Sequence, residues 1–178
     1  AEQIPTCGGW PHSVPSRTSY HGHITFADDV TSGVLTTLRR VQREPVFGFI
    51  TADQRARVDA AVTAGDACLL RLQVRQDGVP TIWAGQYDRT TLQPAQGRKF
   101  ELPALVTDES VGVVRYLMSI PDPAPEVVAS VNAAMTWFQA HALTGWRLET
   151  FETTPAQFQF HRTTVDRRLV ADAGAPLL

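Results

Sequence analysis

The chain has 178 residues, which is enough for one domain with a substantial hydrophobic core. Hydrophobic residues make up 43% of it and charged residues 19%, an ordinary balance for a globular protein. A formal net charge of −2 argues against a general nucleic-acid surface, which would be basic, and no apolar run reaches the ~18 residues of a membrane span. We therefore expect no nucleic-acid partner and no membrane partner.

The opening segment combines unusual features. It holds a Gly-Gly-Trp-Pro turn at residues 8–11 and a tandem pair of aspartates, Asp28 and Asp29. The pair directly precedes apolar residues at helical spacing, so we expect Asp28 to be the N-cap or a first-turn residue of a helix. A carboxylate there is suited to a structural cap and also to a metal ligand. Three histidines lie in the same segment: His12, His21 and His23.

The two cysteines, Cys7 and Cys68, are far apart in the chain. An exported protein would be able to join them in a disulfide, and two free thiols are an equal alternative on the sequence alone.

The rest of the chain predicts four helices. The first runs from about residue 29 to 42, and a capping box at Thr51 opens the second, which runs to about residue 75. Residues 87–107 show no periodicity and predict a long loop, of a length that is usually functional or mobile. The third helix starts at about residue 108 and the fourth at Pro125. Alternation at residues 145–150 and 158–161 predicts short strands.

Five blocks occur in one order along most of the chain. They are Gly-Gly-Trp-Pro with His-Ile-Thr-Phe-Ala-Asp-Asp (8–29), Gly-Asp-Ala-Cys-Leu-Leu (65–70), Trp-Ala-Gly-Gln-Tyr-Asp (83–88), Arg-Lys-Phe-Glu-Leu-Pro (98–103) and Glu-Ser-Val-Gly-Val-Val-Arg-Tyr-Leu-Met-Ser-Ile-Pro (109–121). Together they resemble the family 10 polysaccharide lyases, the calcium-dependent pectate lyases.

The resemblance implies a fold. We expect a mainly α chain, part of an (α/α)3 toroid-like helical domain with long loops and a few short strands. Residues 1–178 would form a single pectate-lyase-like domain without the family's N-terminal helices and C-terminal end. We expect a monomer, secreted or periplasmic.

The resemblance also implies a reaction and a site. The chain would cleave polygalacturonate (pectate) by β-elimination, with Ca²⁺ as cofactor. Asp28 matches the family's calcium-binding Asp, and Asp29 is expected to assist it. Arg98 matches the family's catalytic base. From its chemistry alone Arg98 is instead a carboxylate clamp, since arginine stays protonated up to a pH of about 12.

Further residues are expected to contact the substrate. Trp83 and Tyr87 are candidates for stacking on sugar faces, although a Trp beside Ile is more often in the core. Glu109 matches the family too, yet a first-turn acid of the third helix explains it equally. Arg115, inside that helix, is expected to be structural. The substrate-binding set is His23, Trp83, Tyr87, Lys99 and Glu109.

Departures from the family's pattern keep a second hypothesis open. Ala27 stands where the family has a polar Asn, and Tyr87 where it commonly has His. The alternative is therefore a non-catalytic remnant or fragment that binds acidic polysaccharide.

Overall fold

The computed structural model describes residues 3–15, 19–157 and 162–176. The chain forms two compact units, residues 1–137 and residues 138–178.

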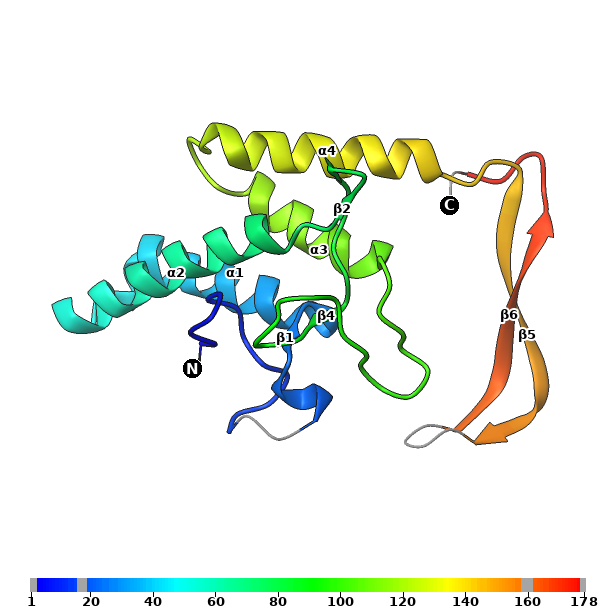
Figure 1. The fold of residues 1–178 in the computed structure, drawn as a ribbon, viewed down its shortest axis with the longest axis horizontal. Coiled ribbons are helices and arrows are strands. Elements are labelled where there is room, and N and C mark those ends of the chain that lie inside the picture. Colours follow the sequence, from blue (N-terminus) through cyan, green and yellow to red (C-terminus); the bar gives the residue numbers. More distant parts are fainter. Residues whose placement is uncertain (1–2, 16–18, 158–161, 177–178) are drawn as a thin grey trace. The chain divides into compact units, whose positions relative to one another are not determined.

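Helices α1 (Val30–Arg43) and α2 (Ala52–Leu72) pack against each other in the first unit (Figure 1). The predicted capping box is confirmed: Thr51 Oγ1 accepts from the backbone N–H of Gln54, whose side chain accepts from the N–H of Thr51. The helices pack closely because α2 carries Gly65 at their contact, where a Cβ would lie 2.5 Å from Leu35. Both predicted helices are thus confirmed, and α2 ends three residues early.

Helix α3 (Thr107–Met118) packs against α1, and α4 (Pro125–His141) follows it in the chain. Both agree with the predicted helices. The third helix buries Val113 and Leu117, with Ser110 turned inward to accept a hydrogen bond from the backbone N–H of Trp83.

A polar cluster joins the three packed helices of this unit. The Arg39 guanidinium on α1 donates to the Tyr116 hydroxyl on α3 (2.8 Å) and pairs with the Asp66 carboxylate on α2. The Tyr116 hydroxyl donates to the same carboxylate. Burial raises the pKa of Asp66, and its two partners oppose that shift.

Short strands connect the remaining chain. Strand β1 (Ile24–Thr25) pairs antiparallel with β4 (Gln86–Tyr87), and β2 (Arg75–Gln76) pairs with β3 (Val79–Pro80). The β1–β4 pairing brings the opening segment to the loop that follows Trp83. A disulfide between Cys7 and Cys68 fixes the opening segment to α2, so the disulfide alternative is the one that the structure adopts.

The second unit holds a long antiparallel hairpin, β5 (Trp146–Gln157) and β6 (Arg162–Ala171) (Figure 1). One of its faces carries the ion pairs of Glu149 with Arg147 and Arg168. The predicted strand at 145–150 falls within β5, which is far longer than expected. The predicted strand at 158–161 lies outside the described residues.

The expected toroid-like fold is wrong. The described residues form four α-helices and three two-stranded antiparallel sheets, about 44% helix and 20% strand, and no toroid. Helical periodicity predicted the individual helices, whereas the toroid rested on the resemblance alone. Among the described helices, none has the length and apolar character needed to cross a membrane.

Candidate functional site

The tandem aspartates adopt a left-handed turn at the start of α1. Asp28 and Asp29 both have φ 55°, and Asp29, not Asp28, is the N-cap of α1. Neither carboxylate caps the helix, because the positive φ directs the chain away from capping geometry. Of the two predicted positions, Asp28 therefore does not take that of the N-cap; it lies in the short 3-10 helix Ala27–Asp29 that leads into α1. Its side chain is 76% exposed, which leaves the carboxylate available to a ligand.

These aspartates line a pocket of about 150 Å³ with the first turns of α3, which we call the acidic pocket. The two helices approach closely there, since a Cβ on Gly112 would lie 2.1 Å from Asp29 Oδ1. The same Oδ1 accepts from Ser32 Oγ (3.1 Å). The charged residues of the pocket are Asp28, Asp29, Asp108, Glu109 and Arg115.

Glu109 is the part-buried carboxylate of the pocket. Burial raises its pKa, and the negative charges of Asp108, Asp28 and Asp29 raise it further. Its Oε2 atom is buried and has no hydrogen-bond partner among the residues that the structure describes. A positive ligand in the pocket would relieve the repulsion among these carboxylates.

Arg98 lies in a tight loop and is held by its neighbours. Its Nε (2.8 Å) and Nη2 atoms donate to Oε1 of Glu101, and its backbone N–H donates to Oε2 of the same carboxylate (2.8 Å). Its guanidinium lies 5.0 Å from the centre of the Phe100 ring. Glu101 raises the pKa of Arg98, and the Asp28 carboxylate adds to that shift. The structure thus brings Arg98 within electrostatic reach of Asp28.

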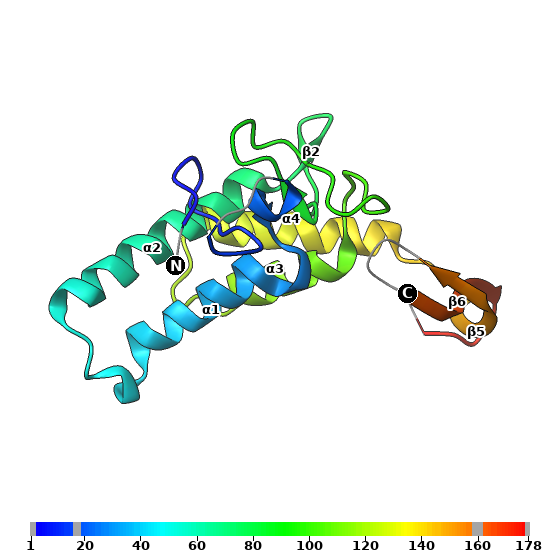
Figure 2. The ribbon, with the colours of Figure 1, turned by 90° about the horizontal axis from the view of Figure 1, so that it is seen from below.

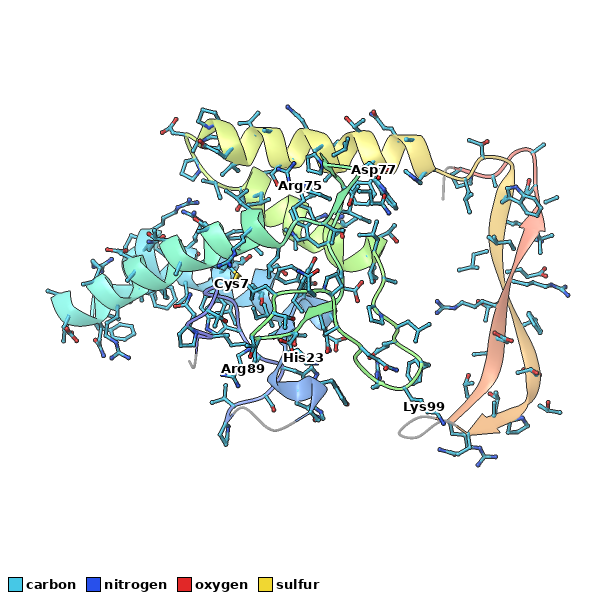
Figure 3. The ribbon with its side chains drawn as sticks, in the orientation of Figure 1. Cys7, His23, Arg75, Asp77, Arg89 and Lys99 are labelled. Carbon is cyan, nitrogen blue, oxygen red and sulfur yellow. A yellow bond between two sulfur atoms is a disulfide. The ribbon has the colours of Figure 1, made fainter. Side chains whose placement is uncertain are left out.

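Histidines border this region as well. His12 Nε2 lies 4.0 Å from Asp28 Oδ2, and its ring contacts those of Tyr20 and His21. His23 is half-buried and helps to lower the pKa of Asp88, after the hydrogen bonds from the Thr91 and Thr90 backbone. Lys99 is exposed beside Arg98 in sequence (Figure 3).

The two aromatic candidates are in the core. Trp83 is 0% exposed and its Nε1 donates to the Leu69 carbonyl (2.8 Å). Tyr87 is 1% exposed, and its hydroxyl accepts from the Ala84 N–H (2.7 Å). Burial raises the pKa of Tyr87. Neither ring presents a face to a sugar, so the prediction that they stack on substrate is wrong for this conformation and the core alternative holds.

The sequence does not identify Glu101 or His12 as site residues, and it predicts a structural role for Arg115. Glu101 was detectable, because an acid three residues after Arg98 can pair with it within one turn of chain. The proximity of His12 to Asp28 accompanies the bridge between Pro11 and Ile24, a pairing that has no local signal in the sequence.

The donors at the acidic pocket suit a hard divalent cation. Carboxylate oxygens are the ligands that calcium prefers, and calcium tolerates sites completed by water or by a second molecule. Within residues 3–15, 19–157 and 162–176, no group of three or more His, Cys, Asp or Glu side chains is arranged to hold a metal ion. Calcium binding at the acidic pocket therefore stays a prediction, and it would need oxygens from water or a second molecule to complete the ligand set.

Comparison with known proteins identifies the class. Residues 2–175 match the family model described as pectic acid lyase, so the chain belongs to the pectic acid lyase family. The family expected from the sequence blocks is confirmed. No curated protein matches the chain.

The solved structures that the chain resembles agree with this family assignment. The family 10 polysaccharide lyase from Cellvibrio cellulosa is 32% identical with a TM-score of 0.75, over 81% of this chain and 47% of its own. An Asp-to-Ala mutant of the family 10 polysaccharide lyase from Cellvibrio cellulosa, in complex with trigalacturonic acid, is 29% identical with a TM-score of 0.78 over 97% of this chain and 53% of its own. The chain therefore spans about half the length of the solved structures it matches.

Proposed function

We propose that the chain acts in the calcium-dependent cleavage of polygalacturonate by β-elimination. The observation that carries the proposal is the exposed Asp28 carboxylate, which lines the acidic pocket with three further carboxylates and lies within electrostatic reach of Arg98. The family membership and the trigalacturonic acid bound to one solved relative support a uronate polymer as substrate.

The reaction removes a weakly acidic proton from C5, next to the uronate carboxylate, and expels the glycosidic oxygen from C4. Negative charge builds up toward the carboxylate, so the site must supply positive charge there. Asp28 and Asp29 would hold a calcium ion, which supplies Lewis acidity beside the substrate carboxylate. The Glu109 carboxylate, whose Oε2 is unpaired among the described residues, borders the same pocket.

Arg98 has two candidate roles at this site. As a base it would accept the C5 proton, as the resemblance implies. As a clamp it would bind a substrate carboxylate through its planar fork. The ion pair with Glu101 supports the clamp, because it favours the protonated guanidinium and already holds a carboxylate against one edge of the fork.

The first experiment is a spectrophotometric assay of the chain with polygalacturonate and Ca²⁺. β-Elimination creates an unsaturated product that absorbs in the ultraviolet, whereas hydrolysis does not. We expect absorbance to rise with wild type in the presence of Ca²⁺ and to stay flat with a chelator. No rise at any pH would contradict the lyase function.

Arg98→Ala and Arg98→Lys extend the assay. We expect Arg98→Ala to abolish turnover, since either role depends on the guanidinium. Arg98→Lys keeps the charge but loses the fork, so full activity in that variant would contradict the clamp, whereas a lysine amine would still be able to accept a proton.

The alternative is a non-catalytic chain that binds acidic polysaccharide. The core positions of Trp83 and Tyr87 favour it, because they remove two expected sugar contacts. Binding of trigalacturonate without any unsaturated product would establish this alternative. In either case the Cys7–Cys68 disulfide supports a secreted or periplasmic location, since disulfides persist in oxidising compartments.

A further inference from the structure

A groove follows the interface of α1 and α3 away from the acidic pocket. Figure 2 shows the two helices side by side. The groove has a volume of about 370 Å³ and shares Asp29, Gly112 and Arg115 with the acidic pocket. The two cavities are therefore adjacent. We call it the α1–α3 groove; its lining is completed by Ser32, Gly33, Thr36, Tyr116 and Ser119.

The groove continues toward the C-terminal end of α1. A cavity of about 280 Å³ shares Thr36 and Ser119 with it and reaches Arg43 in the last turn of the helix. Helix α1 has 14 residues and so extends over roughly 20 Å. The combined surface starts at four carboxylates and ends among arginines, Arg39, Arg40 and Arg43.

Two of the arginines along this path are available to a ligand. Arg39 pairs with Asp66, and Arg40 pairs with Glu44. Arg115 and Arg43 are exposed, and neither forms an ion pair with another residue that the structure describes. Arg115 lies where the groove adjoins the acidic pocket, and Arg43 lies at the opposite end of the path. The two guanidinium groups are therefore spaced along it.

The hydroxyl groups of Thr36 and Ser119 are on exposed residues of the groove and can act as acceptors, whereas Ser32 is buried. The Ser32 hydroxyl donates to Asp29 Oδ1, that of Thr36 to the Ser32 carbonyl, and that of Ser119 to the Tyr116 carbonyl. Their protons are thus engaged, and the lone pairs of Thr36 and Ser119 can accept hydrogen bonds. A molecule with its own hydroxyl donors and periodic carboxylates matches this lining.

We propose that the α1–α3 groove binds the continuation of a polyuronate chain that is engaged at the acidic pocket. Arg115 and Arg43 bind successive carboxylates, and the intervening hydroxyls accept from the sugar. The proposal rests on the proposed function for the identity of the polymer. It adds a binding path and two specificity residues, and it makes affinity depend on chain length.

The test is calorimetric titration of the whole chain with trigalacturonate and with hexagalacturonate in a buffer with Ca²⁺, with every protein also carrying Arg98→Ala so that neither oligomer is cleaved. We expect hexagalacturonate to bind more tightly than trigalacturonate to the chain with an intact groove. Arg43→Ala should reduce the affinity for hexagalacturonate about tenfold, toward that of the trimer, and leave trimer affinity unchanged. Arg115→Ala should weaken both oligomers about tenfold, because it lies next to the acidic pocket.

Arg75→Ala is the matched control, since it removes the same charge from exposed strand β2, outside all three cavities. Circular dichroism of every variant checks folding, and Arg43→Gln and Arg115→Gln replace any alanine variant that unfolds. The proposal would be overturned if Arg75→Ala and Arg43→Ala reduced the affinity for hexagalacturonate equally. It would also be overturned if the chain with an intact groove bound both oligomers with equal affinity. If the affinities follow this prediction but wild type forms no unsaturated product, the lyase function is refuted and the binding role of the groove is still supported.

Discussion

Asp28 is the residue on which metal binding at this site depends most. Its carboxylate is exposed, makes no cap hydrogen bond and borders three other carboxylates. We expect Asp28→Asn to weaken Ca²⁺ binding about tenfold or more by calorimetry, since it removes a charged oxygen ligand while keeping the side chain's size.

The control for that experiment is Asp77→Asn, in the β2–β3 turn, which removes a carboxylate at another positive-φ position. Oligogalacturonate should tighten Ca²⁺ binding, because its carboxylate oxygens complete the ligand set. Equal Ca²⁺ affinity of wild type and Asp28→Asn would rule out a metal site at this turn.

Glu101 stabilises the protonated form of Arg98. Glu101 raises the pKa of Arg98, and Arg98 lowers the pKa of Glu101 below 4.5 through their hydrogen bonds. A carboxylate whose folded pKa is lowered adds stability above its unfolded pKa and loses it as pH falls through the folded value. We therefore expect Glu101→Gln to lower the melting temperature slightly at pH 7, with the difference from wild type shrinking below pH 4.5.

The same variant separates the two roles of Arg98. A clamp that has lost its orienting partner should show a higher KM, while the acid limb of the pH–rate profile stays in place. A shift of that limb to lower pH in Glu101→Gln would instead identify Arg98 as the base, because removing the carboxylate lowers the pKa of Arg98.

The sequence predicted the start of α1 correctly, but not the conformation of the aspartates there or the burial of Trp83 and Tyr87. Helical spacing located the start of α1 to within one residue, yet the left-handed conformation of Asp28 and Asp29 leaves no trace in a hydrophobic pattern. Trp83 and Tyr87 lie in blocks that resemble the family, but a shared block cannot distinguish a sugar platform from a core residue. Their burial depends on long-range contacts with Leu69 and Phe26.

At the scale of elements, the helices were predictable because each one buries a single face. Capping chemistry at Thr51 and Pro125 set two of the starts locally. The β5–β6 hairpin was underestimated, since residues on both of its faces are exposed and no strict alternation extends along it. Hydrophobic periodicity cannot reveal a strand that buries neither face.

The close contact between α1 and α2 at Gly65 predicts how a substitution there changes the free energy of unfolding. Alanine favours a helix interior by about 1 kcal/mol over glycine. At Gly65, however, the added Cβ would lie 2.5 Å from Leu35 and 3.1 Å from Trp10. We expect Gly65→Ala to lower the free energy of unfolding by about 1–3 kcal/mol in urea denaturation.

Gly33 on α1 is the matched control, because nothing lies within 4 Å of its added Cβ. Gly33→Ala should raise the free energy of unfolding by about 0.5–1 kcal/mol. If both variants were stabilised, the close packing of α1 on α2 at Gly65 would be wrong.

At the scale of the whole molecule, the division into two units predicts two stabilities. The first unit has a core that includes Leu35, Leu69 and Leu117, all fully buried, and a disulfide that ties its opening segment to α2. In the second unit, hairpin residues Trp146, Leu148, Val165 and Leu169 are each more than 40% exposed. An isolated two-stranded hairpin is marginally stable in water.

We therefore expect amide hydrogen exchange in β5 and β6 to be much faster than in α2. The hairpin amides should exchange by local opening, whereas the central amides of α2 require opening of the first unit's core. Exchange followed residue by residue by NMR makes the comparison, with the exposed first turn of α2 as the internal control. Equal protection of the hairpin and the centre of α2 would mean that the two units unfold as one, and urea denaturation would then show a single transition.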